Sequence, residues 1–149
     1  MDKLISLLES EHVVDYEVFE HTKPLQSARE GAEYFGIHIG QAAPTLILKT
    51  DKGYFSLIIS GDYGHVDFSL LKDLIQVEEI KLARPQEVEK ITGSKVGSVS
   101  LINPGIPTIL DRELFRFPYV FGGTGVSNTT LKISPKDIEK LNRVIGYIR

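Results

Sequence analysis

Two glycine-containing turns have the most unusual chemistry in this sequence. Residues 97–100 read Gly-Ser-Val-Ser, and residues 122–125 read Gly-Gly-Thr-Gly directly after the apolar run 119–121. Glycine lets the main chain approach a ligand closely, and consecutive N–H groups in such turns form concavities that bind oxygen anions. The two turns therefore predict a site that binds an acyl or phosphate oxygen without using a charged side chain.

Other kinds of site have less support. The second turn can equally be read as a plain connection between strands. It is neither a P-loop nor a dinucleotide-binding turn, because the residues and spacing of those motifs are absent. The sequence has no Gly-x-Ser-x-Gly elbow and no cysteine, which argues against a serine or thiolate nucleophile. Its histidines, His12, His21, His38 and His65, lack metal-ligand spacing, so we expect no metal and no other cofactor.

The elements that must position these turns follow from hydrophobic periodicity and capping residues. We expect helices over 2–11, from a capping box at Ser27 to Gly36, from a cap at Ser69 to 74, over 85–92 and after Ser134. We expect strands over 14–20, 45–49, 54–60, 79–83, 98–102, 107–111, 118–121, 129–133 and 144–148. This order predicts an α/β fold: a single domain, residues 1–149, with a curved, mixed, barrel-like β-sheet and short flanking helices.

Composition agrees with one ordinary globular domain. The chain has 149 residues, of which 42% are hydrophobic and 25% charged. No apolar run has transmembrane length and the amphipathic N-terminus is not a signal peptide, so we expect a cytoplasmic protein with no membrane partner. The net charge of −3 argues against a DNA-binding protein. Basic residues predominate over 129–149, either as a solvated face or as an edge that contacts phosphates.

Several of these pieces occur in a recognisable order. They are the His-Thr-Lys-Pro segment 21–24, the strand 44–50, the turn 96–101, the Gly-Gly pair 122–123 and the Ile-Ser-Pro-Lys-Asp-Ile segment 133–138. In this order and spacing, the sequence resembles the YbaK/prolyl-tRNA-synthetase-associated domain family over nearly its whole length. Members of that family hydrolyse wrongly charged aminoacyl-tRNAs, and their fold is a curved mixed sheet with flanking helices.

The resemblance implies an aminoacyl-tRNA deacylase acting in trans on the 3′ end of tRNA, with an aminoacyl-tRNA synthetase as a second candidate partner. Because the ester is already activated, a positioned water and main-chain N–H groups around the oxyanion can suffice without a metal. We assign that cradle to Gly97, Ser98 and Val99. The expected substrate-binding residues are His21, Pro44, Thr45, Ser100, Gly122, Gly123 and Asp137.

Two of these assignments have alternatives. His21 can be a surface loop histidine with no role in a site. Asp137 is the fourth residue of Ser-Pro-Lys-Asp, where a carboxylate stabilises a helix N-terminus, so we expect its role to be chiefly structural.

The sequence departs from the family at the position of its signature lysine. That lysine opens a Lys-Thr-Leu strand, whereas this chain has Pro44-Thr45-Leu46. Proline supplies no charge and no donor, and Lys49, five residues on, should point to the opposite face of the strand. Ser98 and Leu101 also replace a glycine and a proline of the family turn. Three hypotheses remain: a deacylase that lacks this lysine or recruits another cation, a binding module for the aminoacyl end, and an interaction domain with a vestigial pocket.

Overall fold

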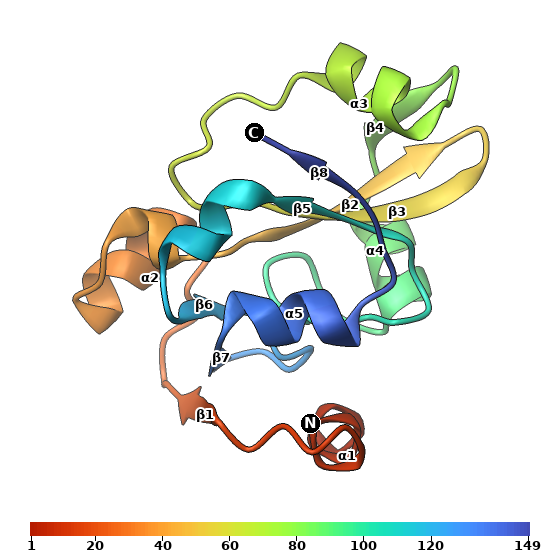
Figure 1. Cartoon of the computed structure of the whole chain (residues 1–149). Coiled ribbons are helices and arrows are strands. Elements are labelled where there is room, and N and C mark those ends of the chain that lie inside the picture. The colour runs from red at the N-terminus through yellow and green to blue at the C-terminus, as the bar shows by residue number, and fades with distance from the viewer.

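The polypeptide forms two β-sheets with five α-helices around them, in a computed structural model that describes residues 1–149 (Figure 1). The larger sheet has five strands in the order β4-β2-β3-β5-β8, and the smaller has three in the order β1-β7-β6. The expected α/β class with a mixed sheet is confirmed. The β structure is nevertheless divided between two open sheets, and neither closes into a barrel.

The helices are α1 (Asp2–Ser10), α2 (Ala28–Phe35), α3 (Phe68–Ile75), α4 (Pro85–Thr92) and α5 (Pro135–Leu141), with short 3₁₀ turns η1 (Ile39–Gln41) and η2 (Arg112–Arg116). The strands are β1 (Tyr16–Glu20), β2 (Thr45–Thr50), β3 (Gly53–Ile58), β4 (Ile80–Leu82), β5 (Thr108–Asp111), β6 (Val120–Gly122), β7 (Thr129–Ile133) and β8 (Val144–Ile148). No helix reaches the length and apolarity that a membrane crossing needs.

The five-stranded sheet is built on the β2–β3 hairpin. Its two strands pair antiparallel from Thr45↔Ile58 to the turn at Thr50↔Gly53. Strand β4 adds antiparallel to β2, while β5 and β8 add in parallel beyond β3. The parallel additions place β3 and β5 in the sheet interior, where the last four residues of β3 and all four residues of β5 are buried.

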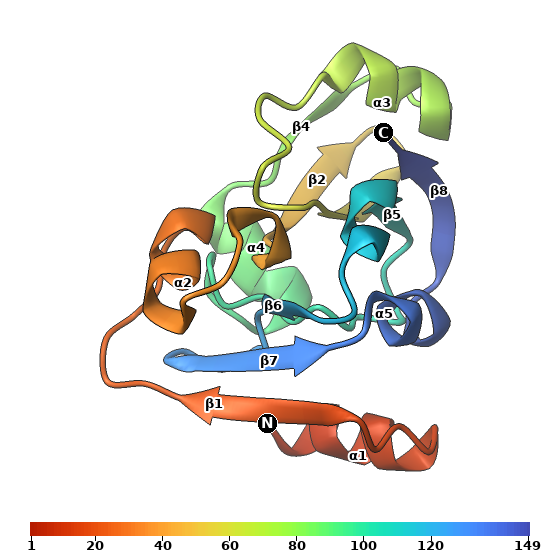
Figure 2. The ribbon, with the colours of Figure 1, turned by 60° about the vertical axis from the view of Figure 1, so that its left-hand side comes forward.

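The three-stranded sheet packs at the other end of the molecule. Strand β7 lies between β1 and β6 and pairs antiparallel with both, and Figure 2 shows β1 running alongside it with α1 at the same end. The main hydrophobic core lies against this sheet and contains Leu8 of α1, Leu131 and Ile133 of β7 and Ile138 of α5, all fully buried. This core anchors β7, and the first residues of β7 line the site described below.

The local signals predicted from sequence mostly match. The Ser27 hydroxyl accepts a hydrogen bond from the Glu30 amide at 3.1 Å, and Gly36 ends α2 in the left-handed region at φ +64°. The cap of α3 was assigned wrongly: Asp67, not Ser69, accepts hydrogen bonds from the amides of the first turn. A carboxylate is a stronger acceptor than a hydroxyl at this position because it also meets the helix dipole.

The strand expected over residues 98–102 does not form. This segment makes only one isolated bridge, between Ser100 and Gly123, in which the Leu101 amide donates to the Gly123 carbonyl at 3.0 Å. Gly97 has φ +92° and the Ser98 amide donates back to the Lys95 carbonyl, so the chain is bent before it reaches the bridge. The segment is therefore a curved wall beside the small sheet.

Candidate functional site

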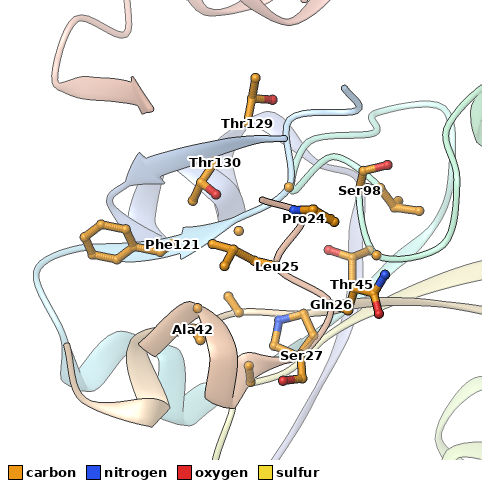
Figure 3. Close-up of a pocket in the computed structure, with 18 of the residues that line it drawn as sticks. Pro24, Leu25, Gln26, Ser27, Ala42, Thr45, Ser98, Phe121, Thr129 and Thr130 are labelled. Carbon is orange, nitrogen blue, oxygen red and sulfur yellow. The ribbon is translucent and has the colours of Figure 1, made fainter. Parts of the chain in front are cut away.

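A cavity of about 440 Å³ lies where the two sheets meet, and five short segments line it (Figure 3). They are residues 24–28, 42–46, 95–99, 121–123 and 127–130, together with His21, Gly31 and Phe35. Among these 25 residues Lys95 is the only lysine or arginine, and there is no aspartate, glutamate or cysteine. A ligand in this cavity therefore meets main-chain groups, hydroxyls, two side-chain amides, one imidazole, one ammonium group and apolar side chains.

The two glycine turns form neighbouring walls of the cavity. A Cβ atom on Gly123 would overlap the Val99 carbonyl oxygen, and one on Gly122 would lie 2.8 Å from the Ala43 carbonyl oxygen. The Gly125 amide donates to the Ser98 carbonyl at 2.8 Å and thereby fastens the second turn to the first. The absence of side chains at 122 and 123 is what lets the three backbone segments approach this closely.

The three amides assigned to an oxyanion cradle are not equivalent. The Ser98 amide donates to the Lys95 carbonyl at 3.0 Å, so it is already used within the turn. The Gly97 and Val99 amides donate to no acceptor in the chain. Val99 is only 4% exposed, and an unpaired N–H in so buried a residue is rare. Gly97 and Val99 are therefore the available donors, and Ser98 shapes the turn between them.

The start of β2 supplies a further polar group without a partner. Pro44 and Thr45 both line the cavity, and the buried Thr45 hydroxyl oxygen has no hydrogen-bond partner in the chain. Lys49 does not reach the cavity, since its Nζ atom pairs with the Glu87 carboxylate at 2.7 Å. This contact keeps the Lys49 ammonium group out of the cavity lining. The Lys49 hydrogen bond is also the main reason that the pKa of Glu87 is lowered.

His21 is part of the cavity wall and is not a surface residue. It is 8% exposed, and its ring lies 5.5 Å from the Tyr34 ring centroid to centroid. Its Nδ1 atom is 2.7 Å from the Lys23 carbonyl oxygen, and its Nε2 atom is 3.0 Å from the Thr130 hydroxyl. Both ring nitrogens are thus engaged, which fixes the orientation of the imidazole.

Two of the expected substrate-binding residues, Ser100 and Asp137, do not line the cavity. The Ser100 hydroxyl turns back and accepts a hydrogen bond from the Ile102 amide at 3.0 Å. Asp137 lies in the first turn of α5, where Ser134 is the capping residue. Local turn and helix geometry sets their positions, so neither side chain contacts a ligand in the cavity.

Sequence reasoning missed several polar lining residues, among them Lys95 and Thr130. Lys95 comes two positions before Gly97, so its proximity to the first turn offered a usable signal. Thr130 meets His21 across 109 residues of sequence through the pairing of β1 with β7. No local pattern carries that information.

The family model of the aminoacyl-tRNA editing domain matches residues 22–141. The chain belongs to the aminoacyl-tRNA editing domain family. All five lining segments of the cavity fall within the residues that match this editing domain, and His21 is the residue immediately before the match.

Relatives and solved structures agree with this membership. The editing domain is 31% identical over 94 residues to the proline–tRNA ligases of Caldicellulosiruptor bescii and Bacillus licheniformis, a match that covers 63% of this chain and 16% or 15% of those enzymes. The chain thus spans about one sixth of the length of these relatives. A structure described as a candidate trans-editing enzyme for prolyl-tRNA synthetase superposes with a TM-score of 0.85 and 24% identity, covering 97% of this chain and 92% of that one. The hypothetical protein APE2540 superposes with a TM-score of 0.87 and 26% identity, covering 97% of each chain.

Proposed function

We propose that this chain is an aminoacyl-tRNA deacylase that acts in trans, in the cytoplasm, on the ester between a wrongly attached amino acid and the 3′ end of tRNA. The observation that carries the proposal is the pair of unpaired amides, Gly97 and Val99, in the wall of a 440 Å³ cavity within an editing-domain fold. Main-chain donors of this kind stabilise the oxyanion that forms when a carbonyl is attacked.

The hydrolysis needs little else from the protein. A water attacks the ester carbonyl and gives up a proton, the carbonyl oxygen becomes negative beside the two amides, and the ribose oxygen leaves with a proton. The products are the free amino acid and the uncharged tRNA. Since no carboxylate or thiolate lines the cavity, positioning and oxyanion stabilisation are the contributions left to the protein. The single histidine and the lack of other metal-ligating side chains also favour a reaction without a metal.

Lys95 is the cation that this site has in place of the family lysine. Pro44 occupies the family position and carries no charge, and Lys49 is held away by Glu87. Lys95 lines the same cavity from the segment that leads into Gly97 and is exposed to solvent. We assign it to a phosphate of the tRNA 3′ end, because an exposed ammonium group on a flexible stem suits a phosphate contact.

Pro44 also favours a second candidate function, a module that binds the aminoacylated 3′ end without cleaving it. The same walls would hold the acyl group, and the missing lysine would account for the lack of turnover. An aminoacyl-tRNA synthetase is the candidate protein partner in either case, since the matched relatives are proline–tRNA ligases.

The experiment that separates the two functions is deacylation of a panel of mischarged tRNAs labelled in the amino acid. Release of label by the wild-type chain, and its loss in Gly97→Ala, supports the deacylase. Absence of release from every pair, with measurable binding of a non-hydrolysable aminoacyl-adenosine, supports the binding module. Absence of both activity and binding rejects both functions.

A further inference from the structure

The hydrogen bonds of His21 determine what the neighbouring hydroxyl can offer to a ligand. The Lys23 carbonyl oxygen can only accept, so the Nδ1 atom, 2.7 Å away, must carry the proton. In the neutral imidazole Nε2 is then an acceptor, and the Thr130 hydroxyl, 3.0 Å away, must donate its proton to it. The Thr130 oxygen is left with its lone pairs only, and so acts as a fixed acceptor.

This fixed acceptor faces the cavity. Thr130 lines it and is only 8% exposed, as is His21. In Figure 3 the Thr130 hydroxyl points toward Leu25, across the cavity, whereas the Thr129 hydroxyl points away from it. Thr129 instead donates to the Val126 carbonyl at 2.7 Å and belongs to the turn before β7. Because Thr130 is buried, water competes little for its hydroxyl oxygen.

We propose that the Thr130 oxygen, held by His21, accepts a hydrogen bond from the α-amino group of the bound aminoacyl ester and thereby distinguishes aminoacyl from plain acyl groups. This inference rests on the proposed function. An amine entering the cavity needs acceptors, and no carboxylate lines the walls to provide one. In this assignment Thr130 contacts the ligand without taking part in the hydrolysis, and His21 positions the Thr130 hydroxyl.

Binding measurements with two analogues test the contact. They are 3′-deoxy-3′-(alanylamino)adenosine and its propionyl counterpart, which differ only in the amine and are joined by an amide that resists hydrolysis. The alanyl group is chosen because it is small enough for any acyl pocket. We expect the wild-type chain to bind the alanyl analogue at least tenfold more tightly by calorimetry, since hydrogen bonds to charged groups are among the stronger ones.

Variants at the same position provide the matched controls. Thr130→Val keeps the shape and removes the hydroxyl, so the preference for the amine should fall to within twofold, while Thr130→Ser should retain it. Equal binding of the two analogues by the wild-type chain, or an unchanged preference in Thr130→Val, overturns the inference and leaves the proposed function standing. Failure of the folded wild-type chain to bind either analogue overturns the inference, and together with absence of deacylation it overturns the proposed function as well.

The tautomer of His21 gives a test that does not depend on any ligand. Long-range ¹H–¹⁵N spectra at pH 8, with the His21 signals assigned by their loss in His21→Gln, should show a protonated Nδ1 and an unprotonated Nε2. The Nε2 shift should move in Thr130→Val, because its donor is gone, and should stay near the wild-type value in Thr130→Ser. A protonated Nε2 in the wild-type chain would make the Thr130 hydroxyl a donor to the cavity and overturn the assignment.

Discussion

The substitution Gly97→Ala tests the oxyanion cradle with the least disturbance of packing. A Cβ atom built on Gly97 meets nothing within 4 Å, so the substitution causes no clash. The backbone, however, has φ +92°, a conformation that L-residues adopt at a cost of about 1–2 kcal/mol. The whole penalty of this variant therefore lies in the backbone that carries the two free amides.

That penalty is large enough to change the reaction. A cost of about 1.4 kcal/mol shifts an equilibrium tenfold, so a turn that relaxes toward negative φ reorients the Gly97 amide in most molecules. Complete loss of one oxyanion donor lowers kcat by about 10²–10³. We accordingly expect kcat/KM for deacylation of labelled aminoacyl-tRNA to fall at least tenfold, with the melting temperature lower by about 2–8 °C.

Gly64→Ala is the matched control. Gly64 has φ +83°, and a Cβ atom there also meets nothing within 4 Å, but the residue does not line the cavity. It should lose similar stability and keep kcat/KM within twofold of the wild type. Full activity in Gly97→Ala, despite a loss of stability like that of Gly64→Ala, would refute the cradle. Equal losses of activity in the two variants would show that destabilisation alone is responsible.

Three other substitutions have defined outcomes. Pro44→Lys should create or increase deacylation in the same assay, and a folded variant without any gain would contradict the alignment of β2 with the family strand. Lys95→Met should raise KM several-fold and flatten its salt dependence, whereas Lys90→Met on α4 should change neither; an unaltered KM in Lys95→Met would reject the phosphate contact. The Arg149 hydrogen bond lowers the pKa of Asp62 to about 2, so its carboxylate stabilises the fold above pH 4, and that contribution is lost as pH falls from 4 to 2. Asp62→Asn should remove this part of the acid dependence of the unfolding free energy in urea titrations, and an unchanged dependence would contradict the ion pair.

The parts of the fold that sequence predicted are those set by neighbours in the chain. The cap at Ser27, the end of α2 at Gly36 and the β2–β3 hairpin each depend on a few consecutive residues. The division into two sheets and the single bridge formed by residues 98–102 at Gly123 are set by tertiary pairing, which propensity does not report. Tertiary packing overrode local preference at these positions.

The candidate site also has a part that the sequence predicted and a part that depends on tertiary contacts. The sequence located both glycine turns and the Pro44–Thr45 segment, because glycine, proline and hydroxyl residues are recognisable without a structure. It could not show that the Ser98 amide is already used in its own turn, since that depends on backbone angles. Nor could it place Thr130 against His21, whose contact arises from the register of β1 on β7.

Glycine is required for different physical reasons in the two turns, and this difference bears on function. Gly122 and Gly123 lack side chains because other backbone atoms occupy the space, which is a requirement of packing. Gly97 borders open space, so packing places no limit on a side chain there. What requires glycine at 97 is the backbone angle, and the consequence of that angle is an amide with no acceptor in the chain beside a cavity. A turn conformation that glycine alone adopts readily, that packing does not demand and that leaves a donor unused, fits the oxyanion site proposed above.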